Sequence, residues 1–112
     1  MQAKEQIETT GAKVETLGEL LAYQDSSIVS RVLLKNNGGT VTLFAFDLGE
    51  GLSEHTAPFE ALVFVIEGQA EVKIAGSAYS VRTGETISLP ANIPHAVKAA
   101  TRFKMLLTMI RA

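Results

Sequence analysis

The chain has 112 residues, a hydrophobic fraction of 46% and no cysteine. This length predicts one domain with a core of its own, and the lack of cysteine excludes disulfides, thiolate metal sites and a cysteine nucleophile. The formal net charge of -2 gives no electrostatic reason to bind nucleic acid or an anionic membrane. No stretch approaches the roughly 20 apolar residues of a membrane span, and the polar opening MQAKEQIETT does not resemble a signal peptide. We therefore expect a cytoplasmic protein.

Residues 1–27 are polar, and no apolar periodicity runs through the first half of them. We expect them to form an N-terminal arm that packs on the remaining domain or on a partner subunit. Within the arm, Thr16 and Glu19 have the spacing of a capping box. This spacing predicts one short helical turn before Leu20 and Leu21.

Residues 28–112 are expected to form the folded domain, built from short strands. The expected strands cover residues 28–35, 41–48, 61–66, 69–74, 78–82, 86–89, 95–99 and 103–110. Residues 36–39, with the sequence NNGG, are the strongest hairpin signal, because asparagine and glycine tolerate the positive φ of tight turns. Residues 69–74 alternate polar and apolar side chains, the period of a half-exposed strand. Strands this short, with turns about every 8–12 residues, predict an all-β sandwich or barrel.

Two stretches contain the only histidines of the chain. In residues 49–68, GEGLSEHTAPFEALVFVIEG, a polar loop that includes His55 is followed by an apolar strand and a closing glycine turn. In residues 84–99, GETISLPANIPHAVKA, a turn and a strand lead through a loop between two prolines to His95. A common site for the two histidines requires these stretches to meet in space.

The two stretches resemble the paired motifs of the cupin superfamily, and the resemblance covers roughly residues 28–110. The first motif reads glycine, five residues, His-x-His, three or four residues, glutamate, six residues, glycine; Gly49, His55 and Gly68 match it. The second reads glycine, five residues, Pro-x-Gly, two residues, histidine, three residues, asparagine. Three residues match it in register: Gly84, Pro90 and His95. The resemblance implies an antiparallel double-stranded β-helix, the cupin jelly-roll barrel.

The chain departs from these motifs at half of the usual metal ligands. Ala57 stands in place of the second histidine, and Ala61 stands in place of the glutamate, with Glu60 one position earlier. In one interpretation His55 and His95 hold a divalent transition metal (Fe, Mn, Ni or Zn), weakly or with Glu60 as a third ligand. In a regular strand, however, Glu60 points to the opposite face from Ala61. In the other interpretation the two histidines line a pocket without metal.

We expect the ligand pocket at the barrel mouth. Its expected lining is Phe59, Ala57, Ala61 and Met105. A concave apolar site with two convergent polar groups is typical of small-molecule binding. The sequence thus predicts a small-molecule-binding cupin of unknown substrate. The alternative is a metal-dependent dioxygenase or isomerase that acts on a small organic acid or sugar.

The apolar strands at residues 28–34 and 103–110 have more apolar faces than one small barrel can bury. Exposed strands of this kind invite pairing, and a two-fold dimer is the commonest closed assembly. We therefore expect a homodimer, with neither nucleic acid nor membrane as a partner.

Overall fold

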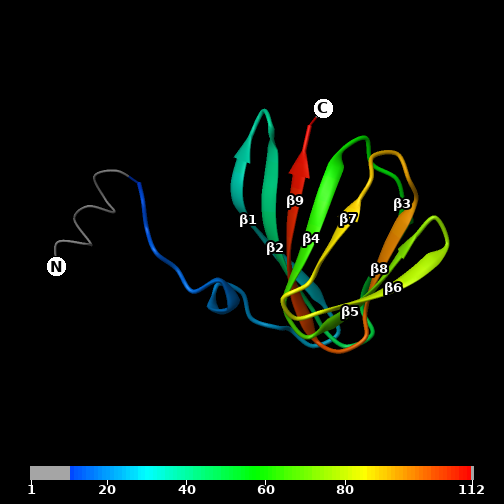
Figure 1. The fold of residues 1–112 in the computed structure, drawn as a ribbon. Coiled ribbons are helices and arrows are strands. Elements are labelled where there is room, and N and C mark those ends of the chain that lie inside the picture. The colour runs from blue at the N-terminus through cyan, green and yellow to red at the C-terminus, as the bar shows by residue number, and fades with distance from the viewer. Residues whose placement is uncertain (1–10, 112) are drawn as a thin grey trace.

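The computed structural model describes residues 11–111, which form nine β-strands and one 3-10 turn, η1 (Figure 1). The strands are β1 (Ile28–Asn36), β2 (Gly39–Phe46), β3 (Gly51–His55), β4 (Glu60–Glu67), β5 (Gln69–Ile74), β6 (Ser77–Arg82), β7 (Thr86–Leu89), β8 (His95–Ala99) and β9 (Phe103–Ile110). No helix among these residues is long and apolar enough to cross a membrane.

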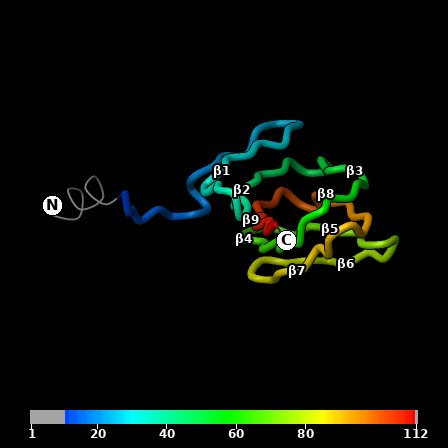
Figure 2. Tube along the Cα trace, turned by 90° about the horizontal axis from the view of Figure 1, so that it is seen from above, coloured from blue at the N-terminus to red at the C-terminus, as the bar shows by residue number. Residues whose placement is uncertain are grey.

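The strands form two antiparallel sheets that face each other. One sheet has five strands in the order β1-β2-β9-β4-β7, and the other has four in the order β3-β8-β5-β6. Seen from above in Figure 2, β2, β9 and β4 lie on one side of the barrel and β8, β5 and β6 on the other. The expected antiparallel jelly-roll barrel is therefore confirmed.

Local sequence signals explain most of the strands. The NNGG stretch joins β1 to β2, and the side-chain oxygen of Asn36 accepts a hydrogen bond from the Gly38 amide at 2.7 Å. In β5 the alternation holds: Ala70 and Val72 are buried, whereas Glu71 and Lys73 are exposed. One shift concerns the expected strand 41–48, which instead spans Gly39–Phe46 because Asp47 begins a turn, where its carbonyl accepts from the Glu50 amide.

Strand β3 corrects the expectation of a loop before the apolar strand. Residues Gly51–His55 pair with β8 alone and form the edge of the four-stranded sheet. Four of the five residues are exposed, with Leu52 as the partly buried exception. A polar edge strand has neither the apolar run of a buried strand nor a full alternation, so its sequence is typical of a loop.

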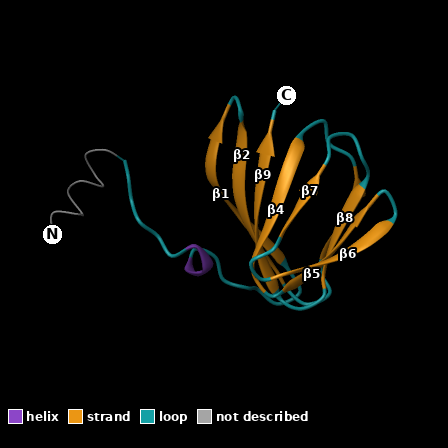
Figure 3. Ribbon diagram, viewed as in Figure 1, coloured by secondary structure: helices purple, strands orange, loops and turns teal. Residues whose placement is uncertain are grey.

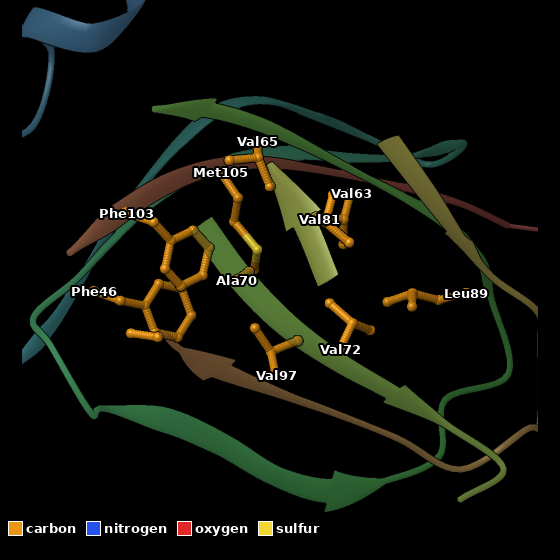
Figure 4. Close-up of a cluster of buried hydrophobic side chains, with 11 residues drawn as sticks. Phe46, Val63, Val65, Ala70, Val72, Val81, Leu89, Val97, Phe103 and Met105 are labelled. Atoms are coloured by element: carbon orange, nitrogen blue, oxygen red, sulfur yellow. The ribbon is translucent and has the colours of Figure 1, made fainter. Parts of the chain in front are cut away.

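The core lies between the two sheets and is mainly aliphatic (Figure 4). Phe46 and Phe103 are fully buried and stack with ring centroids 4.5 Å apart. Met105 belongs to the same cluster and is 1% exposed. The inward face of β9 that starts with Phe103 and Met105 is thus part of the core.

The arm between residues 11 and 27 contains the expected helical turn at Leu17–Glu19 (Figure 3). Thr16 occupies the N-cap position, but its side chain makes no capping hydrogen bond. The capping-box expectation is therefore wrong in its chemistry, although the turn forms where it predicts one. Ahead of this turn the chain runs away from the barrel, and Val14 is 95% exposed (Figure 1).

The helical turn and the arm residues after it dock on the outer face of the five-stranded sheet. Lys104 is 7% exposed there, and its ammonium group donates to the Gly18 carbonyl at 2.6 Å. The same group lies 4.9 Å from the centre of the Tyr23 ring, and the Tyr23 hydroxyl donates to Glu67 at 2.5 Å. Burial of Tyr23, with the Glu67 carboxylate beside it, raises the pKa of the phenol well above its ordinary value. These contacts join the arm to the C-terminal end of β4 and to the N-terminal end of β9.

An ion-pair cluster closes the same end of the barrel. The Arg102 guanidinium contacts Asp47 at 2.7 Å and Asp25 at 2.9 Å. The Arg102 hydrogen bond, together with the Ser26 and Leu48 amides, lowers the pKa of Asp47 to about 2. The arm, the β2–β3 turn and the β8–β9 turn are therefore held together by charge at the end opposite the histidines.

Candidate functional site

His55 and His95 meet across the pairing of β3 and β8. His55 is the last residue of β3, His95 is the first of β8, and the two are register partners. Their ring centroids lie 4.4 Å apart with an interplanar angle of 68°. The two motifs are thus brought together, although forty residues separate the histidines in the chain.

The register of β3 decides which side chain stands opposite His95. Leu52 pairs with Val97, and the next aligned pair is His55 with His95, so β3 has one residue more than β8 between these pairs. Such a bulge shifts the strand by one residue and reverses the faces beyond it. In a regular register Glu54, not His55, would stand opposite His95.

The β7–β8 loop positions the other histidine. Asn92 has a positive φ of 63°, and its amide donates to the Ala57 carbonyl at 2.8 Å. Pro94 ends this loop directly before His95, and its carbonyl accepts from the Ala75 amide at 2.9 Å. The prolines and the Asn92 turn therefore tie the loop before β8 both to the β3–β4 loop and to the β5–β6 turn.

Backbone carbonyls determine the tautomer of both imidazoles. His55 Nδ1 lies 2.8 Å from the Ser53 carbonyl, and His95 Nδ1 lies 3.1 Å from the Ile93 carbonyl. A carbonyl oxygen only accepts, so each Nδ1 donates a hydrogen and each neutral ring has an unprotonated Nε2. Neither Nε2 has a partner within residues 11–111. The pair therefore offers two lone pairs, one on an exposed ring and one on a ring that is 8% exposed.

The structure does not bring Glu60 to this pair. One Glu60 carboxylate oxygen accepts from the Ala91 amide at 3.1 Å. Among the described residues, no three His, Cys, Asp or Glu side chains are grouped so that they could hold a metal ion. A catalytic zinc site usually supplies three protein ligands, so the donor set does not fit a resident divalent ion. The interpretation with Glu60 as third ligand is not supported by this geometry.

The other expected pocket residues are dispersed. Met105 lies in the core, and Ala61 is partly buried against that core. Ala57 is partly buried in the β3–β4 loop, where its carbonyl is bonded to the Asn92 amide. Phe59 is the residue of this set that lines a hollow.

That hollow has a volume of about 70 Å³ and is linked to the histidine pair by the short segment 56–58. Its lining is Gly39, Thr40, Phe59, Met109 and Arg111. Gly39 and Thr40 begin β2, Met109 lies near the end of β9, and Arg111 follows β9 directly. The two strands pair with each other. Sequence reasoning missed Thr40 and Arg111, because nothing in the local patterns at these positions indicates a site.

Among the described residues, four hollows are larger than this one, and the two with the largest volumes lie elsewhere on the barrel. One of about 760 Å³ is bordered by the edge strands β6 and β7 and includes Tyr79 and Ile87. One of about 370 Å³ lies over β3, β8 and β5 and includes Lys73 and Lys98. Neither is lined by a histidine, so the histidines meet at the rim of the barrel and not in either of these hollows.

Comparison with known proteins agrees with the fold and the motifs. The conserved SPY1581 protein of unknown function from Streptococcus pyogenes is 35% identical, with a TM-score of 0.86 over 90% of this chain and 89% of that one. A cupin 2 conserved barrel domain protein from Leptotrichia buccalis is 40% identical, with a TM-score of 0.81 over 84% of this chain and 46% of that one. A curated relative, Polyketide synthase CurC from Streptomyces cyaneus, is 29% identical over 70 residues, which are 62% of this chain and only 46% of that protein.

The family model described as "Cupin domain" matches residues 42–111. This range includes both histidines and eight of the nine strands in whole or in part. The match covers more than half of the sequence, and the solved relatives share its barrel. The chain belongs to the cupin family.

Proposed function

We propose that the protein binds a small molecule at the barrel mouth, with the Nε2 atoms of His55 and His95 as hydrogen-bond acceptors. The observation that carries this proposal is the orientation of the pair: both Nδ1 atoms are bonded to carbonyls, and both Nε2 atoms are uncommitted. A hydroxyl or amide group of a ligand is the complementary donor. A few precisely placed polar groups are the usual means of orienting a small ligand.

Binding at this pair does not depend on a metal. Two imidazoles fall one ligand short of the three that most catalytic metal sites provide, and no third His, Asp or Glu joins them within residues 11–111. The alternative of a metal-dependent dioxygenase or isomerase needs that third ligand. We expect elemental analysis of protein purified without a histidine tag to find far less than one divalent ion per chain.

The test uses the fact that the chain has only two histidines. Their imidazole C–H resonances therefore report on this site alone in a nuclear magnetic resonance titration. We expect monosaccharides or small hydroxy acids to move both ring signals together. Replacing His55 or His95 by alanine should lower affinity about two- to twelvefold, which corresponds to a net hydrogen bond of about 0.5–1.5 kcal/mol.

Glu54→Ala is the matched control, because Glu54 is an exposed neighbour of His55 on the same strand. It should leave the affinity unchanged. Equal binding by the His55→Ala and His95→Ala variants and by the parent protein would refute the proposal. Histidine ring signals that respond to none of the monosaccharides and hydroxy acids would also refute it.

We also propose that a second copy of the chain covers the outer face of the five-stranded sheet. Leu34, Leu62 and Ile110 lie on this face and are 69%, 42% and 58% exposed. The register places Leu34 and Leu62 on the same outward side, since their partners Val41 and Thr108 are paired with each other. Exposed apolar side chains gathered on one sheet face are typical of a protein–protein interface, and a self-complementary face closes as a two-fold dimer.

Sedimentation at micromolar concentration should give twice the 12.0 kDa mass of one chain. Leu62→Asp should shift this mass to that of the monomer, because a carboxylate on the covered face loses its water. Tyr79→Asp is the control, since Tyr79 is 48% exposed on the other sheet. A parent protein that sediments as a monomer contradicts the proposal.

A further inference from the structure

We propose that the hollow beside Phe59 binds a carboxylate group, with the Arg111 guanidinium as its charge partner and the Thr40 hydroxyl as a second donor. The inference rests on the proposed function in one respect: it names an acid group as part of the ligand that the histidine pair contacts. The carboxylate site and the histidine pair consist of different atoms, so this inference and the proposed function can be tested separately.

Within residues 11–111, the Arg111 guanidinium has no acidic partner. The Arg111 amide donates to the Gly38 carbonyl at 2.9 Å, which fixes the backbone. The guanidinium lies 5.6 Å from the centre of the Phe59 ring. Glu60, the acid nearest in the chain to Phe59, is bonded to the Ala91 amide instead.

The Thr40 hydroxyl is the second observation. Its oxygen is buried, and it is the one buried side-chain polar atom of the described residues without a hydrogen-bond partner. Buried polar atoms are nearly always paired in folded proteins, so an unpaired one calls for a ligand or a water molecule. Thr40 stands directly opposite Met109 in the β2–β9 pairing, and both residues line the hollow.

The size and lining of the hollow favour one end of an acid over a whole sugar. At about 70 Å³ it holds roughly two water molecules' worth of liquid volume, which is the scale of a carboxylate group. Gly39 leaves part of its wall without a side chain. The planar guanidinium matches a carboxylate with two parallel hydrogen bonds, and Phe59 and Met109 supply apolar surface to the carbon that bears it.

The hollow and the histidine pair are neighbours in the sequence. Phe59 of the hollow and His55 of the pair are separated by residues 56–58 alone. The two places together call for both groups in one ligand: a carboxylate for Arg111 and a hydroxyl for an imidazole Nε2. This assigns a hydroxy acid, in preference to a neutral sugar, as the ligand class.

The test measures propionate against its neutral isostere propionamide by methyl resonances of ¹³C-labelled methionine. Met109 lines the hollow, while Met105 is buried in the core and serves as an internal reference. We expect propionate to move the Met109 signal and leave Met105 in place, and propionamide to bind at least about tenfold more weakly, because it lacks the charge.

Variants separate the contributions of the two donors. Arg111→Gln should weaken propionate binding at least about tenfold, whereas Arg82→Gln, the same change at an exposed arginine of β6, should have no effect. Thr40→Val should weaken binding severalfold. It should not lower the midpoint of thermal unfolding, since the hydroxyl it removes has no partner in the protein. Equal binding of propionate and propionamide, or an unchanged affinity in Arg111→Gln, would overturn the inference.

The histidine ring signals distinguish this inference from the proposed function. If propionate moves Met109 and no hydroxy compound moves the histidine rings, the carboxylate site stands and the proposed function fails. If monosaccharides move the rings while propionate leaves Met109 unchanged, the carboxylate site is refuted and the proposed function stands.

Discussion

Replacing Phe103 by alanine is expected to lower the free energy of unfolding by about 3–5 kcal/mol. Phe103 is fully buried, and its ring stacks on that of Phe46 at 4.5 Å. The variant loses the transfer energy of the ring, leaves a cavity, and removes an aromatic pair worth about 0.5–1.5 kcal/mol beyond area burial. Because small domains are stable by only about 5–15 kcal/mol, this one change removes a large share of the total.

Urea denaturation followed by circular dichroism measures this loss. Phe44→Ala is the matched control on the neighbouring strand, because Phe44 is only partly buried and its ring lies 6.0 Å from that of Phe46. It should cost clearly less than Phe103→Ala. Equal costs for the two variants would show that the Phe46–Phe103 stack does not anchor the core.

The strands that could be predicted are those whose sequences repeat a structural period or end at a turn signal. The alternation in Gln69–Ile74 gave both the strand and its faces, because one face is buried and the other exposed. The NNGG turn located the β1–β2 hairpin, and the apolar residues before Glu67 located β4. In each case a short-range rule, either side-chain period or tolerance of positive φ, agreed with the tertiary fold.

The elements that could not be predicted depend on distant partners. Gly51–His55 is a strand because β8 offers it a partner, and its own polar residues do not show this. The burial of Lys104 has no signal in its own strand, where a lysine is typical of the solvent face. Lys104 is covered because arm residues near Gly18 and Tyr23 supply a carbonyl and a ring for its ammonium group.

The same division applies to the site. His55 and His95 could be placed together from the motif resemblance alone, and their pairing in the structure agrees with it. The orientation of their rings could not be predicted from the sequence, because it depends on the carbonyls of Ser53 and Ile93. Thr40 and Arg111 were missed because the β2–β9 pairing, which brings their segments together, joins parts of the chain far apart in sequence, and neither residue belongs to a motif.

The second large effect is expected at Gly68, which joins β4 to β5 and closes the first motif. Gly68 has a φ of 83°, a conformation that costs an L-residue roughly 1–2 kcal/mol. A Cβ atom there would stand 2.2 Å from the Arg102 carbonyl oxygen and 2.8 Å from the Phe103 Cα. Backbone atoms cannot rotate away as a flexible side chain would, so Gly68→Ala must displace the start of β9.

Gly76 separates these two costs. Its φ of 86° is nearly the same, but a Cβ atom there would meet nothing within 4 Å. Gly76→Ala should therefore lose only the conformational cost of about 1–2 kcal/mol, whereas Gly68→Ala should lose about 1–3 kcal/mol more from overpacking. Urea midpoints of the two variants, compared with the parent protein, measure the difference. Equal destabilisation would mean that the β4–β5 and β8–β9 turns do not pack as closely as the structure places them, and that φ alone explains the glycine at this position of the motif.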